Sequence, residues 1–145
     1  DHYVFLALLG SCGPEAQVIM SSAKSSADAW ARLTKAYANR SRTRVMSLKE
    51  RLASISKGTS AVSDYLRSIR FIADELALID HPVDDLDLVI ATLNGLGPSF
   101  CEFNASMRAR DTPLSFDELY EKLVDFETFL HREERTDILE LAFLF

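Results

Sequence analysis

Apolar residues recur at intervals of three and four along most of the chain, and this periodicity constrains the fold more than any other feature. The clearest case is the stretch 62–79, in which Val, Tyr, Leu, Ile and Ala form one wide apolar stripe. Val45, Leu48, Leu52 and Ile55 repeat in the same way. A half-buried strand would instead need strict alternation of apolar and polar residues. The sequence therefore predicts an all-α protein.

Helix-stopping and helix-starting residues divide this pattern into eight expected helices. Pro14 suits a first helical turn, whereas Gly58 and Pro82 suit helix ends. The clearest start is Ser115, because Glu118 stands three residues later in the capping-box position. The expected helices cover residues 2–9 and 14–23, a third from about 26 with Trp30, Leu33 and Tyr37 on one face, then 41–57, 62–79, 85–94, 99–109 and 115–130.

The stretch ATLNGLGPSF, residues 91–100, resembles either a phosphate-binding loop or a helix end. A phosphate loop follows a strand, whereas the residues before this stretch have helical spacing. Asn94 and Gly95 suit the left-handed residue that closes a helix, and Gly97-Pro98 prevents the helix from resuming. We interpret the stretch as a helix end.

The sixth expected helix, 85–94, is the best candidate for self-association. Its predicted core face is Leu86, Val89, Ile90 and Leu93, which have spacings of three and four. The side chains expected outside that face, and hence able to meet a second copy, are Asp85, Leu88 and Thr92. An exposed leucine among polar residues is typical of a weak contact between identical copies.

Charge is distributed unevenly along the 145 residues. Residues 1–57 hold nine Lys and Arg against four Asp and Glu, whereas residues 58–145 hold seven against eighteen, which gives the net charge of −6. This asymmetry indicates two lobes with different partners, or opposite charges that meet between copies. Gly58-Thr59-Ser60 is the expected hinge, so we expect one lobe in residues 1–57, a second in 58–135, and an apolar tail in 136–145.

Residue patterns typical of catalysis or metal binding are missing from the sequence. His2, His81 and His131 lie far apart, and neither Cys12 nor Cys101 belongs to a CxxC pair or a nucleophile motif. We therefore expect no catalytic residues, no metal, no cofactor, no enzymatic activity and no small-molecule substrate. The cysteine usage favours an intracellular setting, and no stretch of the sequence is long and apolar enough to span a membrane.

The stretch NRSRTR, residues 39–44, begins a local basic cluster that is a candidate for polyanion contact. Five cations make up this cluster: Arg40, Arg42, Arg44, Lys49 and Arg51. They could hold the phosphates of RNA weakly and without regard to sequence. The alternative is a solvated helix start whose arginines pair with the acidic lobe, because no aromatic residue alternates with these cations to stack bases.

An ordered series of short motifs runs through most of the chain. It comprises Ala29-Trp30 with Leu33 and Tyr37, Leu48, Leu52, Lys57-Gly58, Tyr65-Leu66, Asp74-Glu75-Leu76, Pro82-Val83, Asp87-Leu88-Val89, Leu93-Asn94-Gly95-Leu96, Leu119 and Glu127. In this order the series closely resembles the Gag polypeptide of plant copia-type LTR retrotransposons, up to about Glu134.

That resemblance implies a capsid-like protein with two small helical lobes. Residues 1–57 would be the end of the N-terminal lobe, and 58–135 a four-helix C-terminal lobe similar to retroviral capsid domains. The implied function is structural: homo-oligomers, as dimers or larger species, build a virus-like particle around RNA in the cytoplasm, or in the nucleus. The alternative is a host-captured, Gag-derived helical module for protein interaction. The tail Ile138–Phe145 resembles nothing in the family and is either a remnant or a docking segment.

Overall fold

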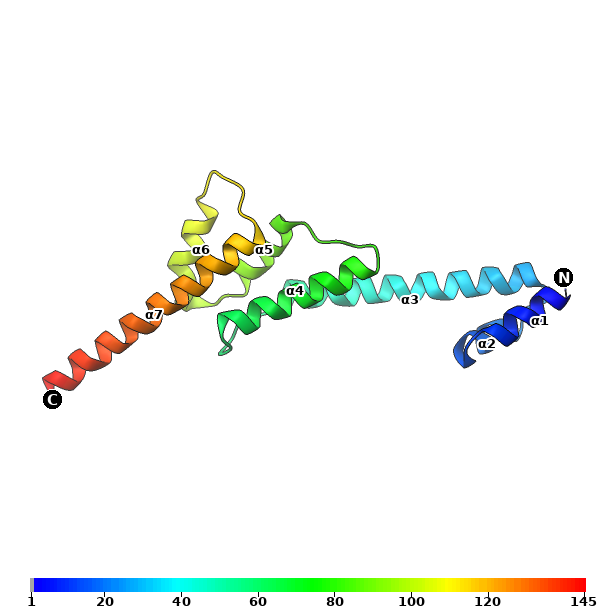
Figure 1. Ribbon diagram of the computed structural model, residues 1–145, viewed down its shortest axis with the longest axis horizontal. Coiled ribbons are helices and arrows are strands. Elements are labelled where there is room, and N and C mark those ends of the chain that lie inside the picture. The colour runs from blue at the N-terminus through cyan, green and yellow to red at the C-terminus, as the bar shows by residue number, and fades with distance from the viewer. Residues whose placement is uncertain (1) are drawn as a thin grey trace. The chain divides into compact units, whose positions relative to one another are not determined.

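The computed structural model describes residues 2–145, with Leu8 described by its backbone only. Every regular element among these residues is helical, which confirms the predicted all-α class (Figure 1). The elements are α1 (His2–Ser11), α2 (Pro14–Met20), α3 (Ser26–Ser54), α4 (Val62–Leu78), α5 (Asp85–Asn94), the 3-10 turn η1 (Pro98–Phe100), α6 (Cys101–Arg108) and α7 (Phe116–Leu144).

Two compact units divide the chain, unit 1 (Asp1–Ser47) and unit 2 (Leu48–Phe145). The predicted boundary lay ten residues later, after Lys57. The difference arises within α3, because the two helices expected around Ser41 form one continuous helix. No Gly or Pro interrupts residues 26–54, and the Thr43 hydroxyl donates to the Asn39 carbonyl at 2.9 Å instead of ending the helix.

Unit 1 is built from α1, α2 and the first part of α3 around a small core. Ala16, Met20 and Ala29 are buried at its centre. Phe5, Leu9, Cys12, Ala23 and Leu33 pack against them as partly buried residues. Of the predicted face of Trp30, Leu33 and Tyr37, only Leu33 packs on the core, while Trp30 and Tyr37 are 61% and 51% exposed.

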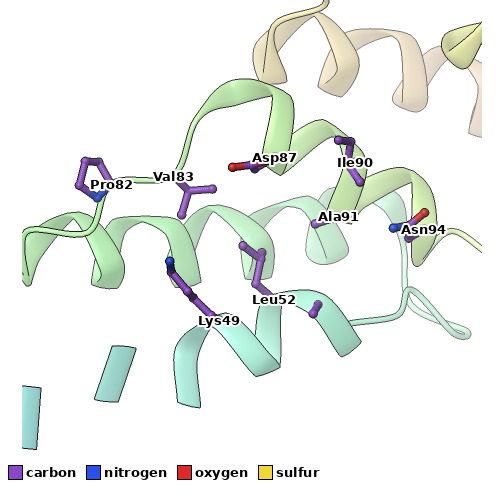
Figure 2. Close-up of a pocket in the computed structure, with 9 residues that line it drawn as sticks. Lys49, Leu52, Pro82, Val83, Asp87, Ile90, Ala91 and Asn94 are labelled. Atoms are coloured by element: carbon purple, nitrogen blue, oxygen red, sulfur yellow. The ribbon is translucent and has the colours of Figure 1, made fainter. Parts of the chain in front are cut away.

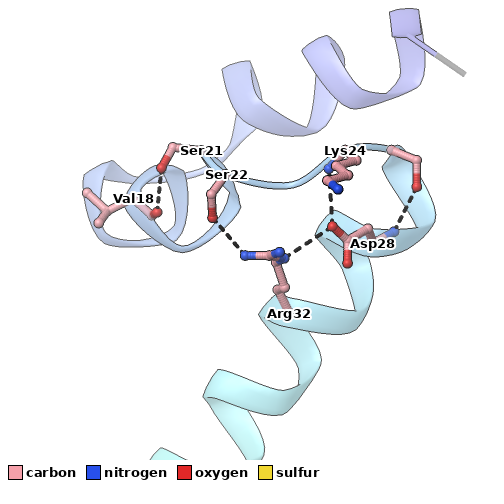
Figure 3. Close-up of polar contacts among 7 residues, drawn as sticks. Val18, Ser21, Ser22, Lys24, Asp28 and Arg32 are labelled. Carbon is pink, nitrogen blue, oxygen red and sulfur yellow. Dashed lines mark hydrogen bonds and ion pairs between the residues drawn. The ribbon is translucent and has the colours of Figure 1, made fainter.

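A network of polar contacts joins the turn before α3 to the first turns of that helix (Figure 3). The Asp28 carboxylate accepts from the Lys24 backbone N–H at 3.1 Å and from the Arg32 guanidinium at 3.2 Å. These two contacts, the Lys24 N–H first, lower the pKa of Asp28. Arg32 also donates to the Ser22 hydroxyl at 2.7 Å, so one arginine links the turn to the helix.

Unit 2 has its core around α4, which contacts α5 and α7. The whole predicted stripe of α4 is buried apart from the half-buried Ile79, because a helix in the middle of a bundle can cover one wide apolar face. Leu119 and Leu123 of α7 are fully buried, whereas Tyr120 between them is 38% exposed. Phe100, Phe103 and Phe126 add an aromatic cluster with ring centroids 5.3 to 5.7 Å from Phe126.

Helix ends in unit 2 follow the sequence signals in part. The Ser115 hydroxyl accepts from the Glu118 N–H at 3.2 Å, as the capping box predicts. Ser99 and Glu102 have the same spacing near the start of α6, but Ser99 lies inside η1. Gly95 was expected in the left-handed region but has φ −98°, so that prediction is wrong; Gly58 and Gly97 are the described glycines with positive φ.

Position 95 requires glycine because a side chain would not fit there, and not because the backbone adopts a positive φ. A Cβ at this position would collide with the Tyr65 hydroxyl and the Ile55 carbonyl. The close approach lets the Lys57 N–H donate to the Gly95 carbonyl at 2.8 Å. The segment after α3 is thereby held against the end of α5.

Candidate functional site

Helix α5 presents a different face to the core from the one that the sequence predicts. Leu88 and Thr92, expected to be exposed and to meet a second copy, are 2% and 0% exposed. Leu86 and Ile90, expected in the core, are 67% and 40% exposed. The assignment of Leu88 and Thr92 to a self-association surface is therefore wrong, and only Asp85 is exposed as expected.

The physical reason lies in how Thr92 is satisfied. Its hydroxyl donates to the Leu88 carbonyl one turn earlier at 2.7 Å, so the polar side chain can be buried without a lost hydrogen bond. Its own carbonyl accepts from the Tyr65 hydroxyl of α4 at 2.9 Å. Burial raises the pKa of Tyr65 to about 12. These contacts fix which side of α5 faces α4.

The outward face of α5 borders an apolar groove (Figure 2). Its walls come from the last turns of α3, the loop before α5, and α5 itself, and its volume is about 330 Å³. The lining residues are Lys49, Leu52, Ala53, Pro82, Val83, Asp87, Ile90, Ala91 and Asn94. Figure 2 shows Lys49 rising from α3 toward Val83, while Asp87 and Ile90 stand on α5. No sequence pattern indicated this groove, because its walls are about 30 or more residues apart in the chain.

The five cations of the predicted basic cluster are all exposed on α3 but do not lie on one side of it. Successive helical residues are rotated by about 100°, so Arg42 points away from Arg40 and Arg44, and Lys49 away from Arg51. Arg40 pairs with Glu15 at 2.9 Å, and because Glu15 also belongs to unit 1, this contact is not the pairing with the acidic lobe that the alternative interpretation predicted.

No aromatic residue is interleaved within the cluster, but Tyr37, which precedes it, accompanies Arg40. Trp30, Tyr37 and Arg44 are seven residues apart and therefore share one side of α3. The Arg40 guanidinium lies 5.9 Å from the centre of the Tyr37 ring. The seven-residue spacing is visible in the sequence, where it predicts a buried stripe. The structure shows instead that Trp30 and Tyr37 are exposed.

The end of α7 is exposed throughout. The helix was expected to end near Leu130, yet it continues to Leu144, and every residue from 131 to 145 is exposed. We call residues 138–145 the tail segment. Its large apolar side chains are Ile138, Leu139, Leu141, Phe143, Leu144 and Phe145.

Metal-binding clusters and membrane-spanning helices are absent from residues 2–145, the part of the chain that the structure describes. Within this range, His, Cys, Asp and Glu side chains form no group of three or more that could hold a metal ion. The helices described in the same range include none with the length and apolar composition of a membrane span.

These features define a helical protein whose exposed chemistry consists of apolar and charged helix faces. Residues 4–137 match the family described as gag-polypeptide of LTR copia-type, and the chain belongs to that family. It is 31% identical over 128 residues to the "Retrovirus-related Pol polyprotein from transposon RE1" of Arabidopsis thaliana, and 30% identical over 132 residues to that from transposon RE2. These alignments cover 88% and 90% of this chain but 9% and 8% of the two polyproteins. No solved structure shows a significant match.

Proposed function

We propose that this Gag domain is a structural protein that catalyses no reaction and self-associates into the shell of a virus-like particle. Membership in the copia-type Gag family over residues 4–137 carries the proposal. By the same analogy, unit 2, with α4 to α7, corresponds to the C-terminal lobe of a capsid-like protein.

The exposed apolar residues of unit 2 support this function. Ile90 and the tail segment place large apolar side chains in water on a unit that otherwise has a well-buried core. Such patches on a folded protein are typical of interaction surfaces. A small patch supports weak pairwise contacts, and many weak contacts allow a shell to assemble without trapping errors.

Size-exclusion chromatography with light scattering over a concentration series tests the proposal. We expect reversible oligomers with a dissociation constant on the order of micromolar or weaker, about 8 kcal/mol or less. Electron microscopy of concentrated protein should then show closed particles or curved sheets. A chain that stays monomeric at every concentration would contradict the proposal and favour a host-captured interaction module.

A second proposed function is weak contact with single-stranded RNA through α3 in unit 1. The supporting observation is that the exposed Tyr37 ring lies 5.9 Å from the Arg40 guanidinium, and that the exposed Trp30 precedes Tyr37 by seven residues on the same side of α3. Aromatic faces that stack bases next to cations are typical of such binding. Fluorescence anisotropy with single-stranded RNA over a salt series tests it.

Replacing both aromatic residues by alanine should weaken RNA binding and leave its salt dependence unchanged, because stacking releases no counterions. Replacing Arg40, Arg42 and Arg44 by alanine should instead make the binding less dependent on salt. Tight binding that survives near-molar salt, or that neither set of substitutions alters, would refute this function.

A further inference from the structure

The groove beside α5 is apolar at its centre and has one charge of each sign among its lining residues. Leu52 and Ala53 line it from α3, Ile90 from α5, and Ile90 is 40% exposed. Lys49 stands on the α3 side and Asp87 on the α5 side (Figure 2). Within the described residues, neither has an ion-pair partner within 4.0 Å. A partner should therefore bring apolar side chains and an anion placed toward Lys49.

The tail segment has the complementary pattern. Ile138 and Leu141 are three residues apart and share one side of α7, and Asp137 lies at the edge of that side. Phe145 follows Leu141 by four residues, directly after the last helical residue, Leu144. Ile138 and Leu141 are 65% and 56% exposed. The segment therefore offers an apolar ridge with an acidic edge, which fits the helix-in-groove mode of recognition.

We propose that the groove of one copy receives the tail segment of a second copy. In this arrangement Ile138, Leu141 and Phe145 enter the groove, and Asp137 pairs with Lys49. The inference rests on the proposed self-association and names the surfaces that carry it. Asp87 on the opposite side sets the orientation, because an acidic edge turned toward it would be repelled.

The tail segment lies outside the groove of its own copy, since no residue of α7 lines that groove and residues 131–145 are all exposed. It is part of α7, and the exposed portion of that helix after Leu130 extends about 21 Å from the core at 1.5 Å per residue. Bending back would require breaking the helix, and residues 131–144 contain no Gly or Pro at which a helix usually kinks. The contact is thus between copies, and since groove and tail are different surfaces, it is heterologous and builds rings or open chains.

The contact is small. Two helical turns in a groove of about 330 Å³ bury well below the roughly 1,600 Å² of a standard interface. We expect weak pairs that accumulate only when each copy uses both its groove and its tail segment.

A complementation experiment with two variants of the full chain tests the heterologous contact. Ile90→Asp places a charge at the groove, and Leu141→Asp places one on the tail segment; both positions are solvent-accessible, so circular dichroism melts should stay close to wild type. Each variant alone should associate at least tenfold more weakly than wild type in sedimentation equilibrium. An equimolar mixture should form dimers but nothing larger, because one intact groove then meets one intact tail segment.

Two further variants separate this contact from other interfaces. Leu86→Asp is the matched control, since Leu86 lies on α5 and is exposed but does not line the groove; it should associate as wild type does. Lys49→Glu should weaken association, and adding Asp137→Lys in the same chain should restore it. The charge exchange stays informative if Ile90→Asp proves unstable.

The outcomes distinguish this inference from the proposed function. A mixture that associates no better than its separate components, or a Leu86→Asp variant as weak as Ile90→Asp, would overturn the groove-and-tail contact. Wild-type protein that associates while every groove and tail variant does so equally well would overturn the contact and leave self-association standing. Wild-type protein that never associates would overturn both.

Discussion

Alanine substitutions at two leucines of α5 can test which side of that helix is buried. Leu88 and Leu86 are two residues apart in one helix, yet their exposed fractions are 2% and 67%. Replacing a buried leucine by alanine removes apolar contacts and leaves a cavity, at a cost of about 3 kcal/mol within a usual range of 2–5. The same change at an exposed site alters stability by about 0.5 kcal/mol or less. Leu88→Ala should therefore be much less stable than Leu86→Ala.

Urea unfolding followed by circular dichroism measures the difference in free energy of unfolding, and thermal melts measure the difference in melting temperature. For a unit of about 100 residues, 3 kcal/mol corresponds to a melting temperature lowered by roughly 12–24 °C, whereas Leu86→Ala should stay within about 4 °C of wild type. Both variants keep the same helix propensity at the substituted site, so that term cancels in the comparison. Equal losses in the two variants, or a larger loss for Leu86→Ala, would refute the orientation of α5.

Three other changes test contacts within unit 2 through its free energy of unfolding. Gly95→Ala should destabilise by about 2 kcal/mol in urea unfolding, because the new Cβ meets the Tyr65 hydroxyl; a neutral or stabilising effect would contradict the packing. Glu127→Ala should cost about 1–2 kcal/mol by the same assay, since the Glu127 carboxylate accepts from the Val62 N–H at the start of α4 at 2.9 Å; an unchanged midpoint would argue against this cap. Tyr65 ionises near pH 10 when unfolded and its pKa is raised to about 12 when folded, so stability should be intact below pH 10 and fall by about 3 kcal/mol as the pH rises through 12. Tyr65→Phe should lack that part of the alkaline loss, and an identical alkaline profile in this variant would refute the assignment.

Sequence periodicity predicted α4 correctly because its apolar residues form only one stripe. Most of the remaining residues of that helix are polar, with Phe71 and Leu78 as exposed exceptions, so a single orientation buries the stripe. The start of α7 was equally predictable, since Ser115 and Glu118 specify a local hydrogen bond that does not depend on the rest of the fold.

The orientation of α5 could not be predicted by the same reasoning. Its ten residues include Leu86, Leu88, Val89, Ile90 and Leu93, and these apolar side chains surround most of the helix. Two stripes are therefore compatible with burial, and hydropathy alone favoured the one without Thr92. Burial of the other stripe depends on the hydrogen bond from Thr92 to Leu88 and on Tyr65, which is far away in sequence.

Helix lengths failed for a related reason. Residues 39–44 in α3 and 131–137 in α7 are strongly polar, and a polar stretch after an apolar stripe resembles a loop. Both stretches contain no Gly or Pro, and Arg and Glu are good helix formers, so a helix that has already begun can continue through them. Neither helix therefore needed a buried apolar stripe along its polar stretch in order to continue.

This continuation of α7 bears on how strongly the groove and the tail segment can bind. The groove is preformed, because the Lys57–Gly95 hydrogen bond joins the segment after α3 to the end of α5, so closing it around a partner requires little ordering. The tail segment is different, since an exposed helical end without tertiary contacts is only marginally stable and frays. Docking must therefore order it, and that conformational entropy opposes binding. A rigid groove and a fraying helix together favour a specific but weak contact, which is the kind that a shell of many copies requires.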